Sequence, residues 1–190
     1  MVKLIKIIAV TCLLTIATPG WTEITGSAGS VASGYAVGET TQSFTVFDVT
    51  GPYKGKRICY VCEFQDEPNI IGFFQKASDQ TADFITRMND LVQKNKDRHL
   101  KAVAVIVAGM DAQPWLEKLS ADKKIEIPLV VLRKGQSDLA VRLYRLNPEV
   151  DNVFMVSINR KVQANISGIG ADKFNLVADA ATRMLKDNNL

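Results

Sequence analysis

The chain has 190 residues, of which 47% are hydrophobic and 23% charged, a composition typical of a globular protein with one core. Its net charge is +3 at pH 7, and Lys3 and Lys6 lie in a segment that we expect to be removed, which leaves +1 (three minus two). A nearly neutral chain gives no sign of the clustered basic face that nucleic-acid-binding proteins use, so we expect no nucleic-acid partner.

The first residues have the pattern of an export signal. Two lysines within residues 1–6 precede an almost purely apolar run over residues 7–17, and Thr18-Pro19-Gly20 ends that run. We therefore interpret residues 1–22 as a signal peptide and expect a periplasmic or secreted protein. The run is shorter than the roughly 20 residues that cross a bilayer, so we expect membrane contact only through an uncleaved signal.

A tether follows the signal in this interpretation. Residues 26–38 are rich in Gly, Ser and Ala, which is typical of a flexible linker, and we place the linker at residues 23–40. No second linker and no repeat occur further on. We therefore expect one domain over residues 41–190, and its cysteines are Cys59 and Cys62.

The remaining sequence alternates between apolar runs and stretches with helical spacing. The helices are expected to begin at N-cap residues, with Ser78 or Asp79, Asp111 and Ser137 as the candidates. In chain order we expect a strand at 43–49, a second short strand or hairpin within 54–64, a strand at 69–74, a helix with its apolar face at 84–92, a strand at 102–108, a helix through Trp115 and Leu119, a strand at 127–132, a short helix at 139–144, strands at 152–158 and 162–166, and a final helix at 174–185.

This order predicts an α/β fold. Strands that alternate with helices indicate a central sheet that is partly parallel. Asn159-Arg160 is too short a connection for a parallel crossover, so the two last strands must form an antiparallel hairpin. The sheet is therefore expected to be mixed.

Several segments, in their order, resemble the redoxin branch of the thioredoxin superfamily, which includes peroxiredoxins and exported thioredoxin-like reductases. They are Phe44-Thr45-Val46 with Gly55-Lys56, residues 96–107, Ile127-Pro128-Leu129 with residues 139–146, and residues 152–162. The resemblance covers residues 37–186 in outline. It implies a thioredoxin-like three-layer sandwich, with a central mixed sheet flanked by helices and an N-terminal β-hairpin.

The chain departs from that family at two places. The resemblance puts the reactive cysteine after the first core strand, at the start of the next helix, where a thiolate is stabilised. Here residues 75–81 fill that position without a cysteine, so we expect no standard peroxiredoxin. The family also has a cis-proline just before the strand at 152–156, whereas Pro148 lies too early in this chain and Pro128 is the other candidate.

Cys59-Tyr60-Val61-Cys62 is the motif with the sharpest chemical meaning. One interpretation is a redox-active dithiol that exchanges with a protein thiol or disulfide. In a straight strand the two cysteines would lie about 10 Å apart, so the pair must sit on a turn or bulge to close a disulfide. Arg57 would favour a thiolate and Glu63 would oppose it. Because we expect no helix start directly after the pair, the sequence predicts a sluggish nucleophile.

Two other interpretations of the pair stay open. It could be a structural disulfide that holds the N-terminal hairpin, although so small a loop brings little entropic gain. It could also be half of a metal site, for which the chain offers only His99 besides the two thiols. Glu63 in place of a histidine argues against haem attachment.

From these observations the sequence predicts an exported thioredoxin-fold protein of cell redox homeostasis. Its function would be thiol–disulfide exchange through the displaced pair Cys59 and Cys62, without a cofactor or metal. The alternative is a non-catalytic binding or structural module of the same fold, with Cys59 and Cys62 joined as a stapling disulfide.

Overall fold

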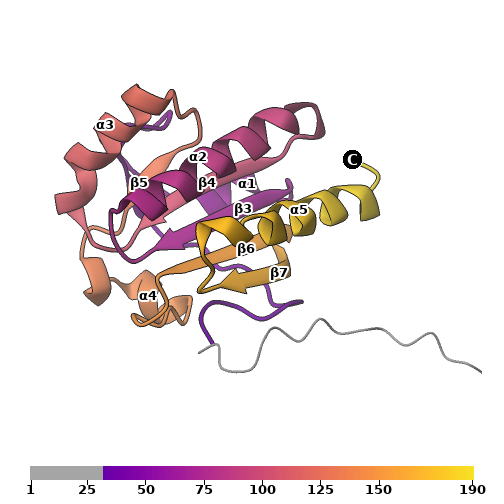
Figure 1. The fold of residues 1–190 in the computed structure, drawn as a ribbon. Coiled ribbons are helices and arrows are strands. Elements are labelled where there is room, and N and C mark those ends of the chain that lie inside the picture. The colour runs from indigo at the N-terminus through magenta and orange to yellow at the C-terminus, as the bar shows by residue number, and fades with distance from the viewer. Residues whose placement is uncertain (1–31) are drawn as a thin grey trace, which may run out of the picture.

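The computed structural model describes residues 32–190 (Figure 1), so the predicted signal peptide and residues 23–31 of the predicted linker lie outside the described residues. Within the described part, seven strands form one sheet in the order β2-β1-β5-β4-β3-β6-β7. The strands are β1 (Val46–Asp48), β2 (Arg57–Ile58), β3 (Asn69–Phe74), β4 (Lys101–Ile106), β5 (Leu129–Val131), β6 (Asn152–Ile158) and β7 (Lys161–Ser167).

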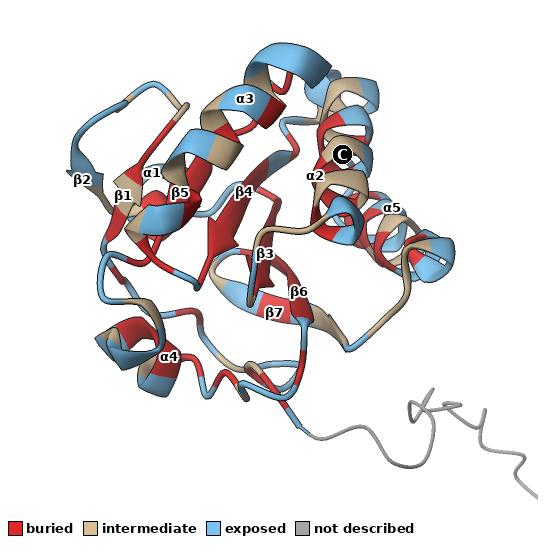
Figure 2. Ribbon diagram, turned by 60° about the vertical axis from the view of Figure 1, so that its left-hand side comes forward, coloured by how far each residue is buried: buried red, intermediate tan, exposed pale blue. Residues whose placement is uncertain are grey.

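The sheet is mixed, as the sequence predicts. The central strands β3, β4 and β5 are parallel, and β6 runs antiparallel to β3. The hairpin of β6 and β7 closes one edge, and the N-terminal hairpin of β1 and β2 closes the other. Every residue of β3 and β6 is buried, which explains their nearly continuous apolar sequences (Figure 2).

The sheet separates two apolar clusters, and helices cover one cluster on each face. On one face, α2 (Asp79–Lys94), α3 (Gln113–Lys123) and α5 (Asn175–Asp187) pack on the strands. On the other face lie the short helices α1 (Tyr60–Phe64) and α4 (Leu139–Leu143). The molecule thus has the three layers that the sequence predicts.

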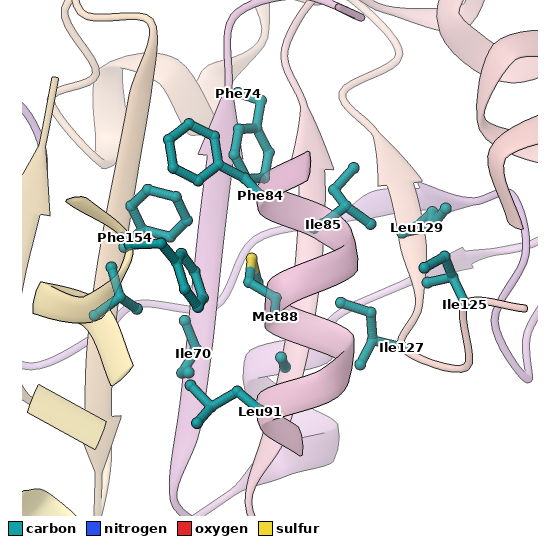
Figure 3. Packing of buried hydrophobic residues seen from close by; sticks show 14 of the residues in the cluster. Ile70, Phe74, Phe84, Ile85, Met88, Leu91, Ile125, Ile127, Leu129 and Phe154 are labelled. Atoms are coloured by element: carbon teal, nitrogen blue, oxygen red, sulfur yellow. The ribbon is translucent and has the colours of Figure 1, made fainter. Parts of the chain in front are cut away.

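Helix α2 begins where the sequence places a cap. The Ser78 hydroxyl accepts a hydrogen bond from the Thr81 N–H at 3.1 Å, which satisfies one of the free amides of the first turn. Along the helix, Phe84, Ile85 and Met88 are fully buried against the sheet (Figure 3). Their helical spacing is the pattern that revealed this helix in the sequence.

Three local predictions are wrong in detail. The second strand of the first hairpin covers only two residues, and the rest of the segment that we assigned to a strand or hairpin forms α1. Asp111 lies in a short 3-10 turn before α3 and does not cap that helix with its side chain. Helix α4 is capped by Asp138 rather than Ser137, because the Asp138 carboxylate accepts from the Ala140 N–H at 3.2 Å.

The residues before β1 form a segment that we call the strap (residues 33–45). Its start is fixed by the Ser33 hydroxyl, which accepts from the Asn147 N–H at 3.0 Å, and by Tyr35, whose ring packs on Tyr144. Further along, the Thr41 N–H donates to the Arg160 carbonyl at 2.7 Å. The packed domain therefore begins before residue 41, where the sequence analysis placed its start.

Within residues 32–190 every peptide bond is trans, including those that precede Pro128 and Pro148. In the same range, no helix is both long and apolar enough to cross a membrane.

Candidate functional site

The position that the resemblance assigns to a reactive cysteine contains no sulfur. We call it the redoxin position (residues 75–81), and it follows β3 and leads into α2. Strand β3 pairs with β4 and β6 over its whole length, so it is a central strand, as expected. The residues that follow it include no cysteine, which confirms the prediction from the sequence.

Four of the polar side chains at the redoxin position have partners within the described residues. The Ser78 hydroxyl lies 2.9 Å from the Thr81 hydroxyl, and the latter donates to the Lys76 carbonyl at 2.9 Å. The Lys76 ammonium forms an ion pair with Asp151 at 3.5 Å, and the Gln75 amide donates to the Asn147 carbonyl at 3.0 Å. The serine contact caps the helix, and since residues 75–81 include no cysteine, this position has no thiol nucleophile.

Cys59 and Cys62 lie at the start of α1, on the face of the sheet opposite to α2. Cys59 is the N-cap, and its backbone carbonyl accepts from the Cys62 and Glu63 N–H groups at 3.0 and 3.1 Å. This turn brings the two Cα atoms to 5.2 Å, and the sulfurs form a disulfide. The prediction that the pair sits on a turn is therefore confirmed, whereas the prediction that no helix start follows it is wrong.

The two cysteines differ in how far they are buried. Cys62 is exposed, whereas Cys59 is half-buried and packs on the apolar cluster beneath α1 and α4. The Cys59 sulfur accepts a hydrogen bond from the Cys62 N–H at 3.2 Å. A partner can therefore reach Cys62, while Cys59 has a donor that would stabilise a thiolate.

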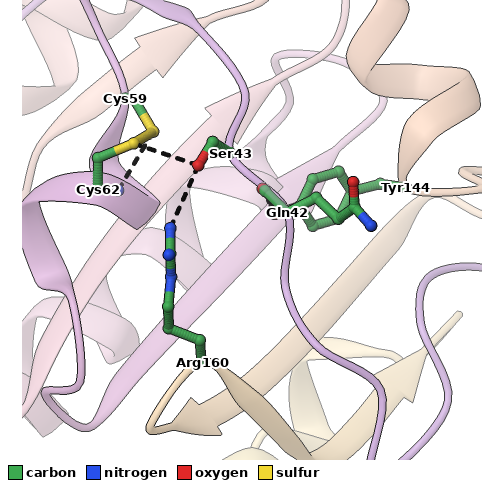
Figure 4. The surroundings of a disulfide bond; sticks show 6 residues. All are labelled: Gln42, Ser43, Cys59, Cys62, Tyr144 and Arg160. Atoms are coloured by element: carbon green, nitrogen blue, oxygen red, sulfur yellow. Dashed lines mark hydrogen bonds between the residues drawn. A yellow bond between two sulfur atoms is a disulfide. The ribbon is translucent and has the colours of Figure 1, made fainter.

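Ser43 and Arg160 complete the surroundings of Cys62 (Figure 4). The Ser43 Oγ atom lies 3.3 Å from Cys62 Sγ. A disulfide sulfur carries no hydrogen, so the serine hydroxyl must be the donor in the oxidised state. The same hydroxyl accepts from Arg160 Nη2 at 3.2 Å. The guanidinium is thus one hydroxyl away from the exposed sulfur.

The charges that the sequence analysis weighed lie elsewhere. Arg57 is exposed on β2, and no hydrogen bond within the described residues joins it to the pair. Glu63 follows Cys62 on α1, and its carboxylate accepts a hydrogen bond from the Tyr53 hydroxyl, which raises the pKa of Tyr53. Arg160, rather than Arg57, is the cation that reaches the surroundings of Cys62, through its hydrogen bond to Ser43.

A buried carboxylate supports α1 from below. The Tyr60 hydroxyl donates to Asp48 at 2.7 Å, and the backbone N–H groups of Gly51 and Tyr53 donate to the same carboxylate at 2.6 and 2.8 Å. Burial, and then the hydrogen bond to Asp48, raises the pKa of Tyr60 well above its usual range. Tyr60, one of the two residues between the cysteines, in this way fixes the turn that carries them.

The remaining metal candidate of the sequence analysis lies apart from the pair. His99 ends the 3-10 turn after α2, in a left-handed backbone conformation. In the region that the structure describes, no group of three or more His, Cys, Asp or Glu side chains is placed to hold a metal ion.

Two site residues were missed by the sequence analysis. Ser43 lies 19 positions before Cys62 and reaches it only because the strap crosses the same face of the sheet. Arg160 comes from the turn between β6 and β7, and its backbone carbonyl is held by Thr41 of the strap. The turn itself was predicted, but nothing in the local sequence indicates which face its side chain reaches.

Comparisons by sequence find no relatives. No protein-family model matches the chain, and no curated protein matches it either.

Solved structures match the fold at low sequence identity. The peroxidoxin BcpB from Mycobacterium tuberculosis is 21% identical, with a TM-score of 0.60, and the match covers 78% of this chain and 96% of that one. A yeast mitochondrial 1-Cys peroxiredoxin is 11% identical, with a TM-score of 0.63 and coverage of 81% and 78%. The thioredoxin domain of a thiol-disulfide oxidoreductase from Bacteroides vulgatus is 15% identical, with a TM-score of 0.59 and coverage of 76% and 97%.

Identities this low establish the architecture and leave the activity to the residues of this chain. The seven-stranded mixed sheet and its helices match both the peroxiredoxins and the thiol-disulfide oxidoreductases. The chain therefore has the thioredoxin-like fold of these structures, without a cysteine at the redoxin position.

Proposed function

We propose that this protein carries out thiol–disulfide exchange with protein dithiols through Cys59 and Cys62. The observation that carries the proposal is that Cys62 is an exposed residue whose sulfur lies in a disulfide at a helix start, beside a hydroxyl donor. Such a sulfur is accessible to a partner's thiolate, and its neighbour Cys59 can leave as a thiolate.

The first step is attack by a partner thiolate on Cys62 Sγ. A new bond forms between the partner sulfur and Cys62, and the bond between Cys59 and Cys62 breaks. Its electron pair goes to Cys59, whose sulfur already accepts from the Cys62 N–H. The partner's proton goes to solvent, because only the thiolate is nucleophilic.

The second step releases the partner. A second thiolate of the partner attacks the partner's own sulfur in the mixed disulfide, and Cys62 leaves as a thiolate. The partner has then lost two electrons and gained a disulfide, while Cys59 and Cys62 have gained two electrons. Two protons taken up from solvent return the pair to the dithiol form.

The place of this reaction is a second part of the proposal. The lysines and apolar run of residues 1–22 support export to the periplasm or outside the cell, and an even number of cysteines after them fits an oxidising compartment. Expression of the full chain followed by fractionation tests this. Export and cleavage support it, and an unprocessed protein in the cytoplasm would overturn it.

Redox titration against glutathione tests the exchange itself. We expect the pair to equilibrate with mixtures of reduced and oxidised glutathione, and to oxidise a reduced protein dithiol catalytically in the presence of oxidised glutathione. Cys59→Ser and Cys62→Ser should each abolish turnover. A disulfide that stays oxidised in every mixture, with no turnover, would refute the proposal.

The runner-up is a non-catalytic thioredoxin-fold module with a stapling disulfide. It is favoured by the half-burial of Cys59 against the apolar cluster, and by the closed hydrogen-bond network at the redoxin position. This alternative expects that variants without either cysteine keep their function as long as they stay folded.

A further inference from the structure

Arg160 has an unusual environment beside the disulfide. Its Nε atom is buried and has no hydrogen-bond partner, and its guanidinium forms no ion pair with a carboxylate of the described residues. A buried donor without a partner costs about 1–3 kcal/mol, and more when it is charged. The residue as a whole is half-buried and its Nη2 atom bonds Ser43, so the unpartnered Nε is the group of this side chain that calls for an explanation.

The backbone of Arg160 is fixed by two hydrogen bonds and by the geometry of its turn. Its carbonyl accepts from the N–H and the hydroxyl of Thr41, at 2.7 and 3.1 Å. Its φ of 60° and the φ of 52° at Asn159 place both residues in the left-handed region, so the turn is a tight one. The hairpin turn and its bonds to the strap therefore fix the backbone position from which the Arg160 guanidinium reaches Ser43.

We infer that Ser43 and Arg160 are positioning residues that stabilise the thiolate of Cys62 when the disulfide opens, an inference that rests on the proposed exchange. The Ser43 hydroxyl accepts from Arg160 and donates toward Cys62 Sγ, so it passes the cation's influence to the sulfur. In the oxidised state the guanidinium has no anion beside it. Release of the Cys62 thiolate supplies one.

Other charges around Cys62 act in both directions. On α1, Glu63 is bound by the Tyr53 hydroxyl, and the loop after α1 carries Asp66; both oppose a thiolate. On β2, Arg57 favours it but is exposed and screened. Beneath the strap, Tyr144 is buried, donates to the Gln42 carbonyl at 2.6 Å, and its pKa is raised chiefly by burial, so it stays neutral.

A stabilised Cys62 thiolate would affect both the rate of the second step and the equilibrium between disulfide and dithiol. A stabilised thiolate is a better leaving group in the second step of the exchange. It also stabilises the dithiol state relative to the disulfide, which makes the pair a stronger oxidant. Ser43 and Arg160 would thus bias the protein toward oxidising its partners.

The test measures the pKa of Cys62 in a Cys59→Ser background, from the ultraviolet absorbance of the thiolate across pH. Adding Ser43→Ala should raise this pKa by about one pH unit, since a hydrogen bond to a charged group is lost. Arg160→Gln should raise it as well, and Ser43→Thr, which keeps the hydroxyl, should leave it nearly unchanged. Arg183→Gln on α5 removes the same charge from the opposite face and is the control.

In the chain with both cysteines, and at a pH above the pKa of Cys62 in both proteins, Ser43→Ala should shift the equilibrium with glutathione about tenfold toward the disulfide, because one pH unit corresponds to a factor of ten. Thermal unfolding shows whether each variant stays folded. If folded Ser43→Ala and Arg160→Gln both leave the pKa of Cys62 unchanged, the inference is wrong, even where exchange occurs. A shifted pKa in a protein that shows no exchange would instead uphold the inference and refute the proposed function.

Discussion

At the residue scale, the site depends on a few polar contacts around one short turn. Asp48 is fully buried, and a buried carboxylate is tolerated only when donors surround it. Tyr60 is the donor that comes from the cysteine motif itself. Gly51 lies so close that a Cβ atom there would be 2.5 Å from the Tyr60 hydroxyl, so only glycine fits beside this contact. The turn with the two cysteines is thereby tied to the first hairpin.

Tyr60→Phe tests this support. It keeps the ring in the core but removes a donor from buried Asp48, so we expect a loss of about 2 kcal/mol in the free energy of unfolding. Tyr53→Phe is the matched control, because the Tyr53 hydroxyl bonds Glu63 at the surface and its loss should cost less than about 0.5 kcal/mol. Urea unfolding gives both values. Equal losses in the two variants would contradict the role of Asp48.

Tyr60 also predicts how stability depends on pH. Because its pKa is raised in the folded state, folded Tyr60 holds its proton where the unfolded chain releases it. The contribution is therefore complete below about pH 10, the ordinary pKa of tyrosine, and is lost as the pH rises above it. Tyr60→Phe should show a weaker decline in stability above pH 10 than the parent. An identical decline would contradict the assignment.

At the scale of elements, the N-termini of α1 and α2 are the two candidate positions for an active site. Helix α2 is long, is capped by Ser78 and occupies the place that the redoxin fold gives to the nucleophile, but it has no sulfur. Helix α1 has only five residues, and the sulfurs are there. So short a helix adds little dipole, and under the proposed exchange we expect the hydrogen bonds to the two sulfurs to provide most of the local stabilisation of a thiolate.

Ser78→Ala separates the two helices experimentally. The variant leaves the Thr81 N–H without its cap, so we expect a loss of about 1 kcal/mol in stability. The equilibrium with glutathione should not change, because α2 packs on the opposite face from the disulfide. Loss of exchange in a folded Ser78→Ala protein would mean that the redoxin position takes part in the reaction.

The sequence was sufficient for the central strands and for the long helices. The segments 69–74 and 152–158 are buried on both faces of the sheet, so their nearly continuous apolar sequences are enough to predict central strands. Helix α1 could not be predicted, because five residues are too few to show a helical period. It exists because Tyr60, Val61 and Phe64 pack into the core.

The site was predictable only in part for the same reason. Cys59 and Cys62 are visible in the sequence because they are neighbours on the chain. Ser43 and Arg160 approach them only through the crossing of the strap and the β6–β7 turn, and such tertiary contacts leave no local pattern.

At the scale of the whole molecule, the disulfide is a small part of the stability. The sheet and two apolar clusters hold the fold together, and the closed loop between the cysteines is very short. In the chain-entropy view, a loop of this size stabilises the native state by about 2 kcal/mol. We therefore expect the protein to open the bond without unfolding, as exchange requires.

Comparison of the oxidised and reduced proteins checks this. Urea unfolding with and without reductant should give a difference of about 2 kcal/mol in the free energy of unfolding, with the fold kept in both states. The double variant Cys59→Ser/Cys62→Ser should match the reduced protein. A reduced protein that is unfolded in buffer would favour the stapling disulfide of the alternative function.

The central claim is that the exposed sulfur of Cys62 exchanges with a partner, and capture of glutathione tests it most directly. Cys59→Ser and Cys62→Ser proteins are mixed with oxidised glutathione, and mass spectrometry with peptide mapping follows the adduct and separates it from Cys12. We predict that Cys62 in the Cys59→Ser protein forms the mixed disulfide readily and that half-buried Cys59 in the Cys62→Ser protein forms it more slowly. No adduct on Cys62 in a folded protein would contradict the account.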